Sequence, residues 1–110
     1  MDLLPRGIAH PKSTSYYAAM GTYGERAQAA LAAEIRAEMA VKRISQSALG
    51  REVGIAQSSL SRYLANEPRD IPFQVLMDIA KALGVTPHEL VERAERRVER
   101  EEAEGDETAG

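Results

Sequence analysis

Residues 46–64, with the sequence QSALGREVGIAQSSLSRYL, decide the fold that we expect for this chain. They predict two short helices joined by a tight turn, because Leu49 and Leu60 belong to a hydrophobic face on either side of Gly54. A residue without Cβ takes positive φ freely, so Gly54 suits a turn that reverses the chain within three or four residues. We expect Gly50 to lie where the two helices cross closely.

The second of these helices, from about residue 57 to residue 64, has one apolar and one polar face. Leu60, Tyr63 and Leu64 recur at helical spacing and predict the face that is directed towards the core. The outward face carries uncharged polar groups and one guanidinium, from Gln57, Ser58, Ser61 and Arg62. These groups suit contacts with base edges in a major groove, whereas an ordinary solvated helix usually presents Glu and Lys. We therefore favour a helix that reads DNA over an ordinary helical hairpin.

At these residues the chain resembles the helix-turn-helix domain of the lambdoid phage repressor and Cro family, also called XRE-like. The resemblance covers about residues 35–91, and it depends on the order and spacing of several features, none of them specific alone. The matching residues are Ser45, Gln46, Leu49, Gly54, Gln57, Ser58, Ser61, Arg62, Tyr63 and the run LMDIAKALGVTPHEL at residues 76–90. The resemblance implies a five-helix, all-α domain that binds double-stranded DNA and usually regulates transcription.

Carried over residue by residue, the resemblance also implies a DNA-binding surface. Gln46 would touch phosphate at the start of the first motif helix. Bases or flanking phosphates would be contacted by Gln57, Ser58, Ser61 and Arg62, and we add Asn66 and Arg69 to the DNA-binding residues.

Two positions depart from the family pattern. Ala56 stands where the family usually has a Ser or Thr N-cap for the recognition helix, and the loss of such a cap costs about 1 kcal/mol. Asn66 stands where a Gly commonly follows that helix. We expect Asn66 to form a left-handed C-terminal cap, because Asn is the next best residue for that conformation.

The whole chain predicts five helices and no strand, near residues 25–43, 46–53, 57–64, 72–83 and 87–100. Ser45 is a good N-cap, and Thr86 with Glu89 makes a capping box around Pro87. The expected core contains Ile35, Met39, Leu49, Val53, Leu60, Leu76, Ala80, Leu83 and Leu90, and we add Phe73 and Val91 to the buried faces of the last two helices. Ala94 and Val98 continue the stripe of the last helix, and we expect them at a dimer contact.

The two ends of the chain differ from its middle, which has room for one domain at residues 25–98. Residues 1–24 predict a flexible N-terminal arm, either a poorly ordered terminus or an arm that wraps DNA through Arg6 and Lys12. Residues 99–110 carry six carboxylates and one arginine and have few apolar groups, so we expect an acidic, disordered tail. Either the tail only keeps the protein soluble or it competes with phosphate for cations of the DNA-binding face.

Composition excludes several other classes of protein. The chain has a net charge of −3 because acidic residues gather in the tail, and the rest of the chain is close to neutral. We therefore expect only weak non-specific binding to DNA, which depends on neutralising phosphates. Cysteine is absent and the two histidines are isolated, and we therefore expect no metal site, no disulfide framework and no cofactor. A Gly-rich phosphate loop and a nucleophile with a partner are both missing, which argues against an enzyme. Without a secretory signal or an apolar span, the expected location is the cytoplasm, with no membrane partner.

Two classes of function remain open at this point. The first is a sequence-specific regulator that binds double-stranded DNA: a compact phage or prophage repressor, a Cro-like switch protein, or the antitoxin of a two-gene module. The second is a protein-interaction adaptor with the same fold. The polar outward face of residues 57–62 favours DNA, because an adaptor would present apolar residues there. Since one short helix reads few base pairs, we expect a weak homodimer on an inverted-repeat operator.

Overall fold

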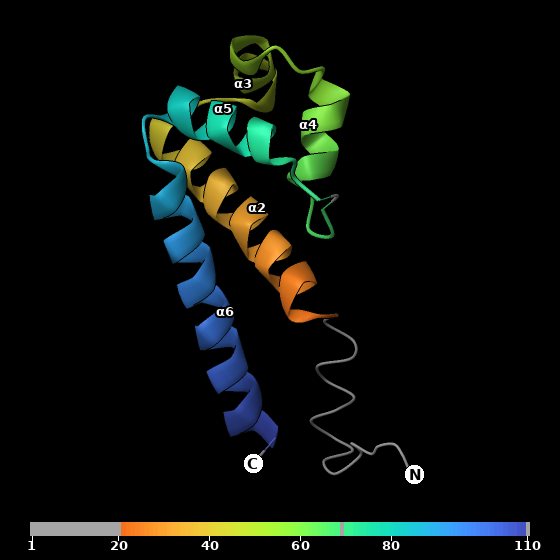
Figure 1. Cartoon of the computed structure of the whole chain (residues 1–110), viewed down its shortest axis with the longest axis vertical. Coiled ribbons are helices and arrows are strands. Elements are labelled where there is room, and N and C mark those ends of the chain that lie inside the picture. Colours follow the sequence, from red (N-terminus) through yellow and green to blue (C-terminus); the bar gives the residue numbers. More distant parts are fainter. Residues whose placement is uncertain (1–20, 69, 110) are drawn as a thin grey trace.

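A computed structural model gives the architecture of the chain and describes residues 21–68 and 70–109. Over those residues it contains five α-helices and no strand, which confirms the predicted fold class (Figure 1). The helices are α2 (Tyr23–Lys42), α3 (Gln46–Val53), α4 (Gln57–Tyr63), α5 (Phe73–Leu83) and α6 (Pro87–Ala109). Most of the expected N-terminal arm, residues 1–20, lies outside the described residues, as does Arg69.

Helices α2 and α6 run antiparallel along one another and form a stem, while α3, α4 and α5 gather at one end of it (Figure 1). Capping boxes start both stem helices. In α2 the Glu25 amide donates to Thr22 Oγ1 at 3.1 Å, and the Thr22 amide donates to Glu25 Oε1 at 2.8 Å. In α6 the Glu89 amide donates to Thr86 Oγ1 and the Thr86 amide to Glu89 Oε1, each at 3.0 Å. The second box confirms the sequence prediction, and the first explains why α2 begins two residues earlier than expected.

The turn between α3 and α4 follows from its glycines. Gly54 ends α3 with φ +74°, the left-handed conformation that the sequence predicts for it. Gly50 is buried, and a Cβ on it would lie 2.8 Å from the carbonyl oxygen of Ile55 and 3.8 Å from the Cα of Gln57. Any side chain at Gly50 would therefore push the first turn of α4 away from α3, which confirms the close crossing.

The core occupies the junction between the three short helices and the stem. All predicted core residues except Val53 are buried, and Val53 is partly buried: the buried ones are Ile35, Met39, Leu49, Leu60, Leu76, Ala80, Leu83 and Leu90. Two predictions are wrong, since Phe73 is 74% exposed and Val91 is 40% exposed. Phe73 is the first residue of α5, two turns before the buried Ala80, and the cover that buries Ala80 does not extend to it. Val91 follows Leu90 and is turned about 100° away from the buried stripe of α6.

The apolar stripe of α6 is buried within one copy of the chain. Ala94 is 4% exposed and Val98 is fully buried, and α6 packs here against α2. Our expectation that these two residues form a dimer contact is therefore wrong. The pattern of α6 shows that the stripe needs a partner helix, but it does not show that the partner belongs to the same chain.

The C-terminal segment also differs from its predicted state, because α6 continues as a helix to Ala109 instead of becoming disordered after Val98. A contact distant in sequence fastens this extension to α2: Arg26 Nη1 donates to Glu102 Oε2 at 2.7 Å. Three residues further on, Gly105 is buried. Glu102 thus belongs to a helix that lies along α2, and not to a free tail.

Ion pairs close one edge of the contact between α2 and α6. Glu34 Oε2 accepts from Arg97 Nε at 2.8 Å, and Glu38 Oε1 accepts from Arg93 Nη1 at 2.8 Å. Glu38 is 8% exposed and also pairs with Lys42 Nζ at 2.9 Å. Hydrogen bonds from Lys42 and Arg93 hold the pKa of Glu38 below its usual value, and Glu38 in turn raises the pKa of Arg93. These charged groups, together with the buried stripe, keep α6 against α2.

Candidate nucleic-acid interface

Helix α4 divides into the two faces that the sequence predicts. Leu60 and Leu64 are buried, at 0% and 1% exposure, and Tyr63 is partly buried beside them. The exposed residues of the other face are Gln57, Ser58, Ser61 and Arg62. Leu60 lies between these polar residues in sequence and is buried. By anchoring α4 to the core, it keeps their side chains on the outward face. Among them only Arg62 is charged.

The first turn of α3 lies against the first turn of α4. Gln46 is the first residue of α3 and is partly buried. Its exposed neighbour Ser47 donates from Oγ to Gln57 Oε1 at 3.3 Å. The structure therefore joins Ser47 to Gln57 across the turn, and Gln46 lies one residue before Ser47. Sequence reasoning missed Ser47, although the close crossing at Gly50 was a signal that the residues before it approach α4.

Helix α4 has weak ends. Ala56 occupies the N-cap position with φ −61° and ψ 142° and makes no side-chain hydrogen bond, as we expected from its methyl group. At the other end α4 stops at Leu64 with φ −105° and ψ 10°. Helices α2, α3 and α5 each end instead on a left-handed residue, namely Arg43, Gly54 and Gly84.

Asn66 is exposed in the segment after α4, but it does not form the left-handed cap that we predicted. Arg43 is the only non-glycine residue with positive φ in the part of the chain that the structure describes. A different contact holds the end of α4: Arg36 of α2 donates from Nη1 to the carbonyl oxygens of Leu64 and Ala65. These carbonyls belong to the C-cap residue of α4 and to the residue after it, where the chain leaves the helix.

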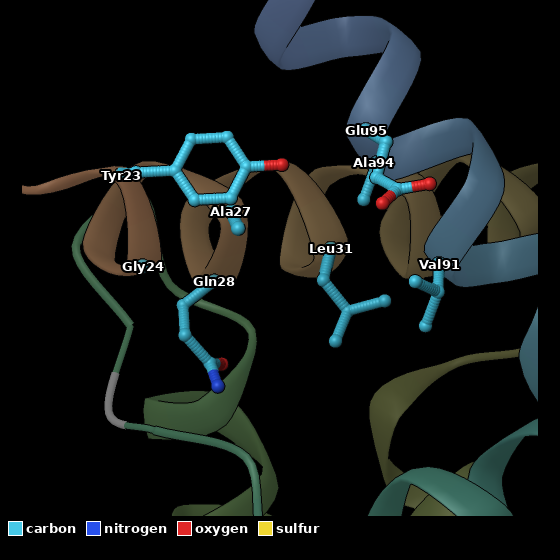
Figure 2. A pocket seen from close by; sticks show the side chains of 8 residues that line it. All are labelled: Tyr23, Gly24, Ala27, Gln28, Leu31, Val91, Ala94 and Glu95. Atoms are coloured by element: carbon cyan, nitrogen blue, oxygen red, sulfur yellow. The ribbon is translucent and has the colours of Figure 1, made fainter.

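A hollow of about 260 Å³ lies on the stem, between the first turns of α2 and the first half of α6 (Figure 2). Its walls are mostly hydrocarbon: Tyr23, Ala27, Leu31, Val91 and Ala94 line it, with Gly24, Gln28 and Glu95 completing the rim. Tyr23 is 54% exposed, so an aromatic ring stands at the open side of an apolar hollow. Such a surface does not resemble the polar face of α4, and it suits contact with another apolar surface.

Within 21–68 and 70–109, no group of three or more His, Cys, Asp or Glu side chains is placed to hold a metal ion. None of the helices described there combines the length and the apolar character needed to cross a membrane.

Comparisons with known proteins agree with this geometry. Residues 34–95 match the model of the Cro/C1-type helix-turn-helix DNA-binding domain, a stretch that contains α3, α4 and α5 whole. Among solved structures, the crystal structure of the clp gene regulator ClgR from Corynebacterium glutamicum is similar, with a TM-score of 0.70 and 20% identity. The match covers 74% of this chain and 86% of that chain, and at this identity it supports the fold alone. No protein with a curated description matches the chain significantly. Since the matching model spans more than half of the sequence, the chain belongs to the Cro/C1-type helix-turn-helix DNA-binding domain family.

Proposed function

We propose that this protein is a sequence-specific regulator of transcription that inserts α4 into the major groove of double-stranded DNA. The observation that carries the proposal is the exposed face of α4, which presents amide, hydroxyl and guanidinium groups above a fully buried Leu60. A guanidinium can make paired hydrogen bonds to guanine, and a glutamine amide can do so to adenine. Membership of a DNA-binding family supports the same role.

The candidate contacts divide by their place on this surface. Arg62 and Gln57 are the two side chains of α4 best suited to base edges, with Ser58 and Ser61 beside them. Gln46, at the start of α3, is assigned to a phosphate. Asn66 and Arg69 follow α4 in sequence, and we assign them to the flanking backbone, where contacts position the protein without reading sequence.

Within this class we favour a compact repressor or a Cro-like switch protein acting in the cytoplasm. A small domain that occupies an operator blocks polymerase by its bulk, and it needs no second contact to repress. A promoter with the bound site between its −10 and −35 elements tests this in a purified transcription reaction. We expect transcription to fall as protein is added, and a rise in transcription would make the protein an activator.

We further propose that the protein binds DNA as a weak homodimer, joined through the apolar edge of the stem around Tyr23 and Val91 (Figure 2). Ala94 and Val98 are buried within the monomer, so α6 can contribute to a dimer only through its remaining exposed residues. The opposite edge carries the ion pairs of Glu34 and Glu38, whose charges a partner would have to desolvate. The apolar edge has a single carboxylate among its lining residues, Glu95, which is exposed at the rim.

Sedimentation on an inverted-repeat DNA tests the dimer. The variant Val91→Glu should reduce the complex from two protomers to one, because it buries a carboxylate at the interface. Phe73→Glu on α5 is the matched control, since Phe73 is an apolar residue that is 74% exposed on a different helix. If Phe73→Glu dissociates the dimer and Val91→Glu does not, the interface lies on α5.

Selection of binding sites from a random pool of duplex DNA tests the function as a whole. We expect enrichment of an inverted repeat whose half-sites are about 34 Å apart, one turn of DNA. Recovery of the pool without enrichment, at salt concentrations that permit binding, would contradict the proposed function.

A further inference from the structure

The weak ends of α4 raise the question of what holds this helix in place. It has seven residues, and isolated helices of that length are unstable in water. Its N-cap is an alanine, and its C-terminal residue is not left-handed. Two leucines attach it to the core and determine which face is buried, but they leave the backbone groups at its C-terminal end without directed contacts.

A side chain from outside the helix-turn-helix unit supplies directed contacts. Arg36 of α2 extends to the C-terminal end of α4, where Nη1 donates to the carbonyl oxygen of Leu64 and, at 3.3 Å, to that of Ala65. A cation at this end is also favoured by the partial negative charge of the helix terminus. Arg36 is partly buried, so water screens this contact less than it screens a surface pair.

The segment that follows α4 is tied to the same helix. Gln28 Oε1, two turns before Arg36 on α2, accepts from the amide of Ile71 at 3.0 Å. Two side chains of α2 therefore hold the backbone on both sides of residues 66–70. Lys42 makes a similar contact with the carbonyl oxygen of Leu83 at the end of α5, but Gly84 already caps that helix. At the end of α4, by contrast, Arg36 makes its contact without a left-handed residue that caps the helix.

We propose that Arg36 is a positioning residue for DNA recognition: it fixes the C-terminal end of α4, and with it the direction of Arg62, without touching DNA. The effect of Arg36 on DNA recognition rests on the proposed function, whereas its stabilisation of the C-terminal end of α4 does not. The competing role for an arginine in this domain is a direct contact with phosphate, and the two roles differ in what their loss changes.

Amide hydrogen exchange in the free protein tests the hold on α4. Arg36→Met keeps an unbranched apolar stem, shorter than that of arginine, and removes its donors, so the amides of residues 61–65 should exchange about tenfold faster, the effect of losing one charged hydrogen bond. Amides of α6 should be unchanged. Arg100→Met, which removes an exposed arginine of α6, is the control for net charge and should leave α4 unaffected.

Arg36→Lys keeps the charge but replaces the planar guanidinium by an ammonium, and it should speed exchange in α4 by about two- to threefold. If Arg36→Met does not unfold cooperatively, amide exchange in Arg36→Lys tests the proposal instead. Unchanged exchange in α4 for every variant that folds would overturn the proposal.

Salt titration on the selected DNA site separates positioning from phosphate contact. Arg36→Met should weaken binding about tenfold at each salt concentration, with the slope of log K against log salt unchanged. A slope that falls by about one, with normal exchange in α4, would mean that Arg36 touches phosphate and would overturn the proposal. If the parent protein binds no DNA site, the proposed function fails, while the exchange experiment still decides whether Arg36 holds α4.

Discussion

Helices α4 and α6 are stabilised in opposite ways, although they belong to the same small domain. Helix α6 has 23 residues, begins with a complete capping box, and is fastened to α2 by ion pairs along a buried stripe. Helix α4 has seven residues, no side-chain N-cap, and depends on buried leucines and on Arg36 from another helix. The helix assigned to DNA thus has its exposed positions free for recognition, and its neighbours supply the stability that these positions do not.

The largest effect is expected where α4 joins the core. Leu60 is fully buried, so Leu60→Ala should lower the free energy of unfolding by about 2 to 5 kcal/mol through lost burial and the cavity left behind. Urea denaturation measures this difference. Val41→Ala, at a residue that is 74% exposed on α2, is the control and should cost less than about 1 kcal/mol. Equal losses for the two variants would mean that α4 is not anchored through Leu60.

The next effect concerns the charged attachment of α6. Glu38→Gln should lower the free energy of unfolding by about 1 kcal/mol at pH 7, a modest value because Lys42 and Arg93 are partly exposed and screened. The folded pKa of Glu38 lies below its ordinary value of 4.5, so its stabilising effect is complete above that pH and is lost as pH falls through the folded pKa.

Urea denaturation of the parent and of Glu38→Gln between pH 2 and pH 7 follows this loss. The difference in unfolding free energy should be greatest above about pH 5 and should shrink as the carboxyl is protonated. A difference that grows towards acid pH would show that the ion pairs do not stabilise α6.

Removing the N-cap of α6 and adding one to α4 tests the difference between the two helices further. Thr86→Ala removes the N-cap of α6 and should cost about 1 kcal/mol, while Ala56→Ser gives α4 a hydroxyl acceptor and should add about 0.5 to 1 kcal/mol. Thermal unfolding of the two variants should therefore shift in opposite directions. A downward shift for Ala56→Ser would indicate that the first turn of α4 cannot accept a side-chain cap.

The smallest expected effect concerns the acidic end of α6. Ending the chain after Val98 removes six carboxylates, including Glu102, which pairs with Arg26. If these carboxylates compete with phosphate for cations, the truncation should tighten non-specific binding by about twofold, and most at low salt. A full-length variant with Glu99→Gln and Glu101→Gln controls for the shorter helix. Superimposable salt titrations for all three proteins would leave only a solubility role.

Local sequence signals predicted most of the fold. Gly54 and the Thr86 capping box mark helix ends by backbone chemistry that needs no tertiary contact, and the structure has both. The errors concern surfaces whose partner lies far away in sequence. Periodicity showed that Val98 needs cover, but it could not show that α2 supplies it. Similarly, the run after Val98 looked too polar to fold because the pairing of Glu102 with Arg26 joins residues 76 positions apart.

In the candidate site, too, local features could be predicted from the sequence and contacts between distant residues could not. The outward face of α4 follows from helical periodicity, and burial of Leu60 confirms its phase. The contacts of Ser47 with Gln57 and of Arg36 with Leu64 depend on how helices cross, which composition and spacing do not determine. Asn66 illustrates the limit most clearly, because it forms no left-handed cap and a side chain from α2 contacts the end of α4 instead.

In the proposed function α4 reads DNA through its outward face, and the affinity of Arg62→Ala for the selected DNA site at matched salt tests this role most directly. We expect specific binding to weaken by about 1 to 3 kcal/mol, with the temperature of unfolding unchanged because Arg62 is exposed. Arg100→Ala, which removes an exposed arginine from α6, should bind as the parent does. If Arg62→Ala binds that site as tightly as the parent, α4 does not recognise DNA in the way proposed.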